Sequence, residues 1–343
     1  MASLDDALTK LLDGGGPPAA VARGMLSGLR EALASVSPGE REVSAAIARL
    51  LSSPISTPPD LAPDKGLAAL WERTIPAVDE RSPGEPARDV GRLWDEIHLL
   101  GLRMSADDRT DLEARVAAEA RASGAEPGAA TTVVLGLVRE TLIPALRVGG
   151  RVVSTGLATA PDAPPPPDLP TGGDAEAMAL LRLAAPILTL VSRDRHLSHC
   201  LQILQSRGLA SLAAPTEQER LRNQLVSRVT TVTGMTTHSM DWLEQLVRAH
   251  EAITSVVHVP PAPEGSWWGR LRLHAHTVVR DGANLVGPGL VKLPPSRFTA
   301  ARAFTEHDIP LKVPESTGMV LACVRVWSRI HDVESPGRVI YAS

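Results

Sequence analysis

The alternation of residue types between Arg270 and Thr277 is the feature that most constrains the fold of this chain. One set of alternate positions holds two arginines and two histidines, and the other holds Leu271, Leu273, Ala275 and Thr277. Side chains of a β-strand point alternately to opposite faces, so a period of two predicts a half-buried strand. We therefore expect a strand here, with its cationic and titratable side chains on the outer face.

The sequence after residue 255 differs from what precedes it. Prolines and glycines recur at short intervals, and apolar runs of a few residues lie between them. This punctuation is typical of an irregular antiparallel β module. The spacing in segment 318–331 fits a strand or a helix, and we favour a strand. Residues 337–341 are predicted to form the final strand.

Before residue 255 the apolar residues recur at helical spacing. Aromatic residues make up only 3% of the chain, so the core is formed mainly by Ala, Leu and Val. Ser105 and Ser239 are predicted to cap helices, and Gly101 to end one. The predicted helices cover residues 3–13, 19–35, 37–51, 66–78, 82–100, 105–123, 129–147, 174–191, 193–207, 217–233 and 239–250.

These patterns together predict an α+β fold, mainly helical in its N-terminal and central regions and followed by a small C-terminal β-rich module. A run of prolines in the middle of the sequence favours an extended spacer between two helical regions. The predicted organisation is a helical domain at 1–147, a Pro/Gly-rich linker at 148–173, a helical segment at 174–255 and the β-rich module at 256–343.

Composition and charge argue against several classes of protein. The formal net charge of −4 gives no overall basic field, so we expect no nucleic-acid partner. Two cysteines are too few for a disulfide framework, and the N-terminus lacks the pattern of a signal peptide. No apolar run is long enough to span a membrane. The expected location is therefore the cytoplasm.

The sequence contains no established catalytic motif. It has no phosphate-binding loop, no dinucleotide-binding glycine motif after a strand, and no serine nucleophile elbow. Cys323 and His331 are residue types that catalyse nucleophilic chemistry, but sequence spacing does not bring them together. We expect a protein without enzymatic activity.

A metal site is the alternative for which the sequence offers candidate ligands. On the helix predicted at 193–207, His196 and His199 would share one face with Cys200. His274 and His276 on the predicted strand would add imidazole ligands, and zinc is the metal that such a set favours. The competing interpretation is structural, since Cys200 lies among leucines, where a buried cysteine acts as a small apolar residue.

The predicted strand also offers a surface for another protein. Trp267 and Trp268 would point to opposite faces, and tryptophan and arginine are enriched at the centres of protein interfaces. Arg270 and Arg272 would lie about 7 Å apart on one face and could bind acidic groups. The alternative for this row is a solvated outer face of the sheet.

Our leading hypothesis is therefore a non-enzymatic interaction or assembly protein. Its partner would be another protein or a second copy of the chain, bound through the Trp/Arg/His strand. Two alternatives remain open: a metal-dependent hydrolase or transferase with a histidine-rich site, and a subunit of a homo-oligomeric shell or filament.

Overall fold

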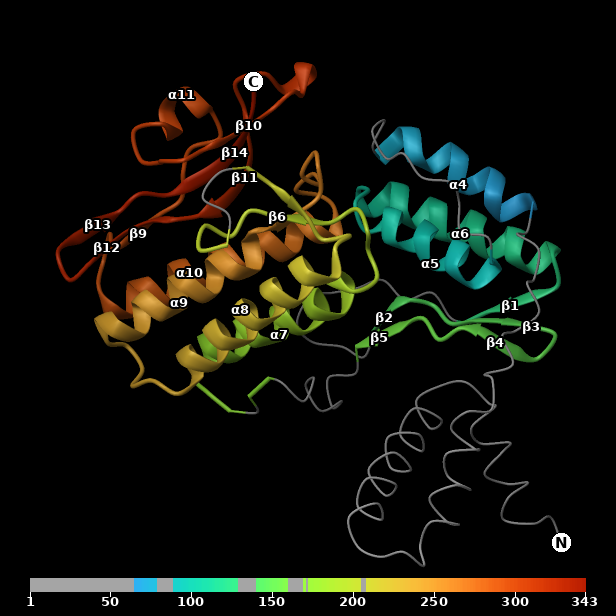
Figure 1. The fold of residues 1–343 in the computed structure, drawn as a ribbon, viewed down its shortest axis with the longest axis horizontal. Helices are drawn as coiled ribbons and strands as arrows, with labels where there is room; N and C mark the ends of the chain where they lie inside the picture. The colour runs from blue at the N-terminus through green and yellow to red at the C-terminus, as the bar shows by residue number, and fades with distance from the viewer. Residues whose placement is uncertain (1–64, 79–88, 129–139, 160–168, 171, 205–207) are drawn as a thin grey trace, which may run out of the picture. The chain divides into compact units, whose positions relative to one another are not determined.

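The computed structural model describes the following residues, which are coloured in Figure 1: 65–78, 89–128, 140–159, 169–170, 172–204 and 208–343. By its internal contacts the chain divides into two compact units, one of Met1–Pro63 with Arg88–Val90 and one of Asp64–Ala87 with Gly91–Ser343. The elements below belong to the second unit, apart from Val90 at the start of one helix. The helices predicted at 3–51 lie outside the described residues, and the predicted domain boundaries stay predictions.

The first part of this unit combines three helices with two small antiparallel sheets. Its elements are α4 (Lys65–Val78), α5 (Val90–Gly101), α6 (Ala106–Ala122), β1 (Ala125–Pro127), β2 (Glu140–Ile143), β3 (Leu146–Val148), β4 (Arg151–Ser154) and β5 (Leu157–Thr159). The helices predicted at 66–78 and 105–123 are confirmed, and so is the second half of the one predicted at 82–100, whose residues 82–88 lie outside the described ranges. Ser105 caps α6 as expected, accepting the Asp108 N–H at 3.2 Å.

The helix predicted over 129–147 is wrong where the structure can test it. Residues 140–148 form strands β2 and β3, with Pro144 between them, and 129–139 lie outside the described residues. Proline has no amide hydrogen and disfavours helical geometry in the residue before it. The Trp94 indole donates to the Pro144 carbonyl oxygen at 2.7 Å, which fixes this break against α5.

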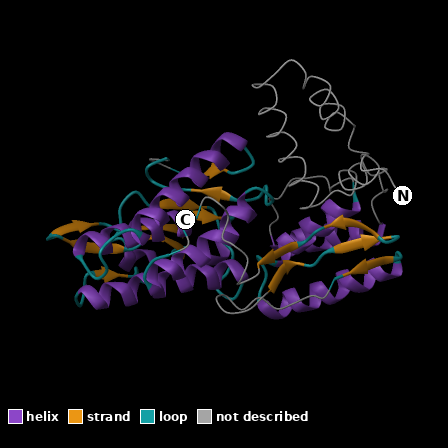
Figure 2. Ribbon diagram, turned by 90° about the horizontal axis from the view of Figure 1, so that it is seen from below, coloured by secondary structure: helices purple, strands orange, loops and turns teal. Residues whose placement is uncertain are grey.

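Four long helices form the centre of the unit. They are α7 (Ala175–Val191), α8 (Pro215–Thr233), α9 (Met240–Thr254) and α10 (Trp267–Val286). The first three confirm the predicted helices at 174–191, 217–233 and 239–250. Helix α9 contacts the other three helices and also the C-terminal strands, so it lies between the helical layer and the sheets (Figures 1 and 2).

The helix predicted at 193–207 is wrong. Ser198–His199 is the short strand β6, which pairs with β7 (Ala210–Ser211) and β8 (Val256–Val257). The side chains of Leu197 and Leu201 are buried, as the spacing predicted, but from loop positions next to the strand. Residues 205–207 lie outside the described residues.

The C-terminal module holds two of the three-stranded sheets among the described residues, as its predicted β-rich character implies. Its elements are β9 (Val291–Lys292), the short α11 (Phe298–Ala301), β10 (Ile309–Leu311), β11 (Val320–Arg325), β12 (Trp327–Ile330), β13 (Val333–Ser335) and β14 (Arg338–Ala342). One sheet has the order β10-β14-β11, with β10 parallel to β14, and the other has the antiparallel order β13-β12-β9. The strands predicted at 318–331 and 337–341 and the α+β class are confirmed.

The strand predicted at 270–277 is wrong, because these residues lie inside α10. Over 20 residues the buried positions follow helical spacing, from Trp267 and Trp268 to Ala275 and Ala283. The strict alternation covers only eight residues and also satisfies part of this longer pattern. Ser266 caps the helix by accepting the Gly269 N–H at 2.9 Å. Gly282 lets α10 approach α9 closely, since a methyl group there would lie 2.6 Å from Leu246 Cδ2.

Candidate functional site

The residues predicted as a partner surface do not form an exposed row. Trp267 and Trp268 are 1% and 0% exposed, and Arg272 is 5% exposed. The Arg272 guanidinium donates to the Ala262 carbonyl oxygen, and that of Arg270 to the Gly265 carbonyl oxygen at 2.7 Å. These side chains therefore anchor the start of α10, and the premise that one strand face exposes them is wrong.

The four histidines predicted as metal ligands have separate partners or environments. His199 Nε2 lies 3.0 Å from Glu217 Oε2, and His276 Nδ1 lies 2.7 Å from His250 Nε2. His274 is exposed on α10, and His196 lies in the loop before β6. Within the described ranges, no three His, Cys, Asp or Glu side chains are grouped so that they could hold a metal ion. The predicted site therefore gains no geometric support.

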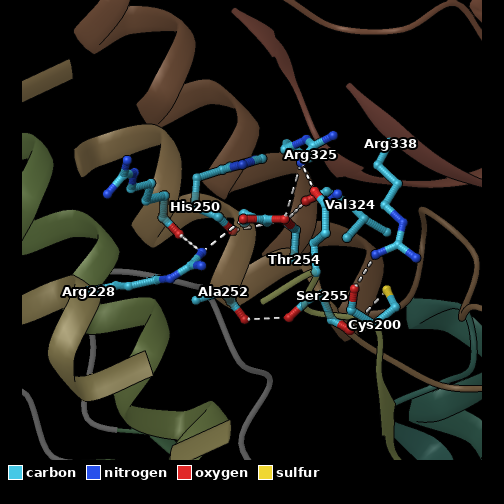
Figure 3. A network of polar contacts seen from close by, with 12 residues as sticks. Cys200, Arg228, His250, Ala252, Thr254, Ser255, Val324, Arg325 and Arg338 are labelled. Carbon is cyan, nitrogen blue, oxygen red and sulfur yellow. Dashed lines mark hydrogen bonds and ion pairs between the residues drawn. The ribbon is translucent and has the colours of Figure 1, made fainter. Parts of the chain in front are cut away.

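The most extensive polar network lies where α9 meets the C-terminal sheet (Figure 3). Glu251 is at its centre, with its carboxylate 2.9 Å from an Arg228 nitrogen and 4.0 Å from an Arg325 nitrogen. Arg325 also donates to the Pro336 carbonyl oxygen at 2.8 Å. The Glu251 side chain is only 8% exposed, so the two guanidinium groups compensate a largely buried negative charge.

Two hydroxyl groups extend this network along α9. The Thr254 hydroxyl donates to the Val324 carbonyl oxygen at 2.6 Å, and the Ser255 hydroxyl to that of Ala252 at 2.9 Å (Figure 3). Arg338 is fully buried and donates to the Cys200 carbonyl oxygen at 2.7 Å and the His307 carbonyl oxygen at 2.8 Å. These bonds join α9 to β11, and β14 to the residue that follows β6, so they connect elements that are distant in sequence.

The groups of this network are not arranged for nucleophilic chemistry. Burial raises the pKa of the Cys200 thiol and of the Cys323 thiol to about 12, which disfavours the reactive thiolate. The hydroxyls of Thr254 and Ser255 both donate to backbone carbonyl oxygens. His331 lies 2.7 Å from Asp241 instead of pairing with a cysteine. The arrangement supports a structural role for these residues.

Thiol reactivity tests this interpretation. In the folded protein at pH 8, Cys200 and Cys323 are expected to react with DTNB at least about a hundredfold more slowly than a free thiol, because both are buried and protonated. Both should react at once after unfolding in guanidinium chloride. Absorbance at the thionitrobenzoate band measures both rates. Rapid reaction of one thiol under native conditions would contradict the structural role.

Burial holds the imidazoles of His258, His250 and the partly exposed His276 in neutral form. His258 is fully buried and its Nε2 lies 2.8 Å from Asp194 Oδ2. Burial lowers the pKa of His258 to about 4, although Asp194 acts to raise it. Burial likewise lowers the pKa of His276 to about 4 and that of its partner His250 well below its usual value. None of the three is available for proton transfer near neutral pH.

A different surface combines cations with aromatic rings. In the β13-β12-β9 sheet Lys292 is the direct partner of Trp327, and its ammonium lies 4.6 Å from the Trp327 ring and 5.8 Å from the Phe304 ring. The Arg329 guanidinium lies 5.6 Å from the Trp327 ring. We call Lys292, Phe304, Trp327 and Arg329 the C-terminal aromatic surface.

The exposure of this surface suits contact with another molecule. Trp327 is buried at 7% exposure, whereas Phe304 is 38% exposed. Arg329 pairs with Glu334 on the neighbouring strand. Lys292 forms no ion pair with a carboxylate in the described part of the chain. The surface therefore presents one uncompensated cation beside an exposed aromatic ring.

Sequence reasoning missed this surface. Trp327 and Arg329 are two residues apart in segment 318–331, and the strand favoured for that segment already places both on one face. Lys292 and Phe304 reach the same place only through the pairing of β9 with β12, which no local pattern indicates.

Comparison with known protein families, characterised proteins and solved structures finds no match for this chain.

Proposed function

We propose that this chain is a non-enzymatic interaction or assembly protein and that its partner binds the C-terminal aromatic surface. The observation that carries the proposal is the pair of cations beside the Trp327 ring, with Phe304 exposed next to them. Arginine is among the residues that dominate the binding energy of many protein interfaces, and the Arg329 side chain is 53% exposed. This assignment replaces the surface predicted around Trp267 and Arg272.

The chemistry of the surface indicates the kind of partner. Lys292 offers a positive charge that has no carboxylate partner among the described residues, and Phe304 offers apolar area at its edge. A protein segment with an acidic side chain next to an apolar one would complement both. Such an acidic group would lie close to an aromatic ring and a cation, a setting in which charge-assisted hydrogen bonds are stronger than in water.

One structural finding bears on membrane association. None of the helices in the described residues is long and apolar enough to cross a membrane. The cytoplasmic location and the absence of a nucleic-acid partner are part of this proposal. They rest on the composition of the chain.

Replacement of Lys292 by Glu together with Phe304 by Ala tests the proposal. The full chain should capture a stoichiometric partner from native lysate, and the double variant should capture it about tenfold less or weaker still, since it reverses the charge and removes the exposed ring. Mass spectrometry quantifies the captured protein. The Leu273→Glu variant is the matched control, because Leu273 is 55% exposed on α10, outside the surface.

The same experiment separates self-association from a second protein. Light scattering gives the mass of the purified wild type and of the double variant. If the wild type has the mass of two or more chains and the double variant that of one chain, the partner is a second copy. Equal capture by the wild type and the double variant, with both folded by circular dichroism, would exclude the C-terminal aromatic surface. A monomeric chain that captures nothing would exclude the proposed function.

A further inference from the structure

Four side chains of the β13-β12-β9 sheet share one of its faces. Lys292 is the direct partner of Trp327, and Arg329 is the direct partner of Glu334. Directly paired residues of antiparallel strands project to the same face, and so do residues two apart on one strand. This face therefore contains three members of the C-terminal aromatic surface and, in addition, Glu334.

The opposite face of the sheet is turned towards the helices. Ser328 and Ile330 alternate with the β12 residues named above, and both are buried. Strand β12 contacts α9, and β9 contacts α10. The face that carries Glu334 is therefore the outer one, and the side chains of Arg329 and Glu334 are each more than half exposed.

The two edge strands carry opposite charges on this outer face. Strand β9 contributes Lys292 at one edge, and β13 contributes Glu334 at the other, with β12 between them (Figure 1). Adjacent strands lie about 4.8 Å apart, so the two charged residues are separated by about 10 Å across the sheet. Trp327 and Arg329 lie on the strand between them.

Both edge groups can accept a further partner. The Lys292 ammonium contacts the Trp327 and Phe304 rings, but no carboxylate of the described residues forms an ion pair with it. Arg329 donates through Nε and Nη2 to the same oxygen of Glu334, Oε1. The other oxygen, Oε2, has no hydrogen-bond partner in the part of the chain that the structure describes. An ionised carboxylate accepts hydrogen bonds at both of its oxygens.

A two-fold axis parallel to β12 makes this face complementary to itself. Such an axis, placed between two facing sheets, lays β13 of one copy over β9 of the other, and β9 over β13. Glu334 of each copy then lies opposite Lys292 of the other, so the same contact forms twice. A two-fold interface of this kind uses one patch on both copies and closes at two chains.

The residues near the axis are compatible with such a contact. Phe304 offers an exposed ring next to Lys292, and burial of its apolar area would favour association. Arg329 would lie near the Arg329 of the second copy, which carries the same charge. The ion pair with Glu334 in its own chain compensates that charge.

We propose that the partner of the C-terminal aromatic surface is a second copy of this chain, held by reciprocal ion pairs between Lys292 and Glu334. This inference rests on the proposed function, because it names the partner of the same surface. An unrelated protein with an acidic segment would pair with Lys292 alone, whereas a second copy also uses the exposed carboxylate of Glu334. The closed symmetry predicts a dimer instead of a filament.

Charge reversal tests the proposal, with the mass of the purified full chain measured by analytical ultracentrifugation. The wild type should have the mass of two chains. Lys292→Glu and Glu334→Lys should each weaken dimerisation at least about tenfold, because the symmetry places each like-charge pair in the interface twice. Val333→Lys is the matched control and should leave the dimer intact. Val333 is exposed on the same strand, but its side chain projects to the opposite face.

An equimolar mixture of the two variants separates a contact between chains from an effect within one chain. A Lys292→Glu chain that faces a Glu334→Lys chain regains both attractive pairs. The mixture should therefore form dimers at a concentration where each variant alone is monomeric. A mixture that stays monomeric would refute the contact between Lys292 and Glu334, and so would a dimer that both reversals leave intact.

Failure of this inference and failure of the proposed function give different results. A monomeric wild type excludes a second copy as the partner. The proposed function is then retained if the chain captures another protein that the double variant of Lys292 and Phe304 does not capture. A monomeric wild type that captures nothing excludes both.

Discussion

Lowering the pH from 7 to 5 is expected to reduce the free energy of unfolding by several kcal/mol. Burial lowers the pKa of His98, His258 and His276 from the usual 6.5 to about 4. Above pH 6.5 these imidazoles are neutral in the folded and the unfolded chain. Between pH 6.5 and 4 only the unfolded chain takes up the protons, so folding stability falls, by about 2 kcal/mol per histidine at pH 5.

A loss of this size is a large part of the stability of a typical domain, which is about 5–15 kcal/mol. Urea unfolding followed by circular dichroism at pH 7.5, 6.5, 5.5 and 4.5 measures it. In His258→Gln the slope of the unfolding free energy against pH should correspond to the uptake of close to one proton fewer on unfolding. Gln keeps an N–H for Asp194 but does not titrate. His274→Gln, at an exposed position on α10, is the control and should keep the wild-type slope. A stability independent of pH down to 4.5 would contradict the buried neutral histidines.

The helical part of the fold was predictable where caps and apolar spacing agreed. Ser105 precedes α6 and Ser239 precedes α9, and in both cases the predicted cap and the observed hydrogen bond coincide. Such signals are local, since a cap satisfies amide groups within its own first turn. The same holds for the strand at 320–325, where alternation was correctly preferred.

The wrong predictions share a physical origin. In residues 270–277 the alternation of residue types over about two helical turns is also typical of a strand. The apolar spacing over all 20 residues of α10 instead indicates a helix. In residues 193–204 helical leucine spacing was satisfied by loop and strand positions around β6. In both cases the prediction used a short pattern, whereas the structure follows a longer pattern in α10 and the pairing of β6 with β7 and β8 in the other segment.

The candidate site shows the same limit. The C-terminal aromatic surface needs the pairing of β9 with β12. It was invisible as a sequence motif because its residues are ordinary and widely spaced. Conversely, Trp267, Trp268 and Arg272 are adjacent and conspicuous in the sequence, yet they are buried. Clustering along the sequence was therefore a poor guide to exposure.

Replacement of Gly269 by Ala is expected to destabilise the protein by about 3 kcal/mol. Gly269 lies in the first turn of α10, where Ala would ordinarily stabilise a helix by about 1 kcal/mol. Here the added methyl group would lie 2.1 Å from the Pro263 carbonyl oxygen and 2.5 Å from the Glu264 Cα. Because both contacts are with backbone atoms, the turn before α10 or the helix itself must move. Thermal unfolding should show a midpoint lower by roughly 5–10 °C.

Gly265→Ala is the matched control for this prediction. Gly265 lies in the same turn, its backbone is not left-handed, and a methyl group there would meet no atom within 4 Å. The free energy of unfolding should therefore change by less than about 0.5 kcal/mol. If both variants were equally stable, the first turn of α10 would not lie against residues 263–264. That outcome would contradict the close approach of this turn to α10, which the bonds of Arg272 to the Ala262 carbonyl oxygen and of Arg270 to the Gly265 carbonyl oxygen also span.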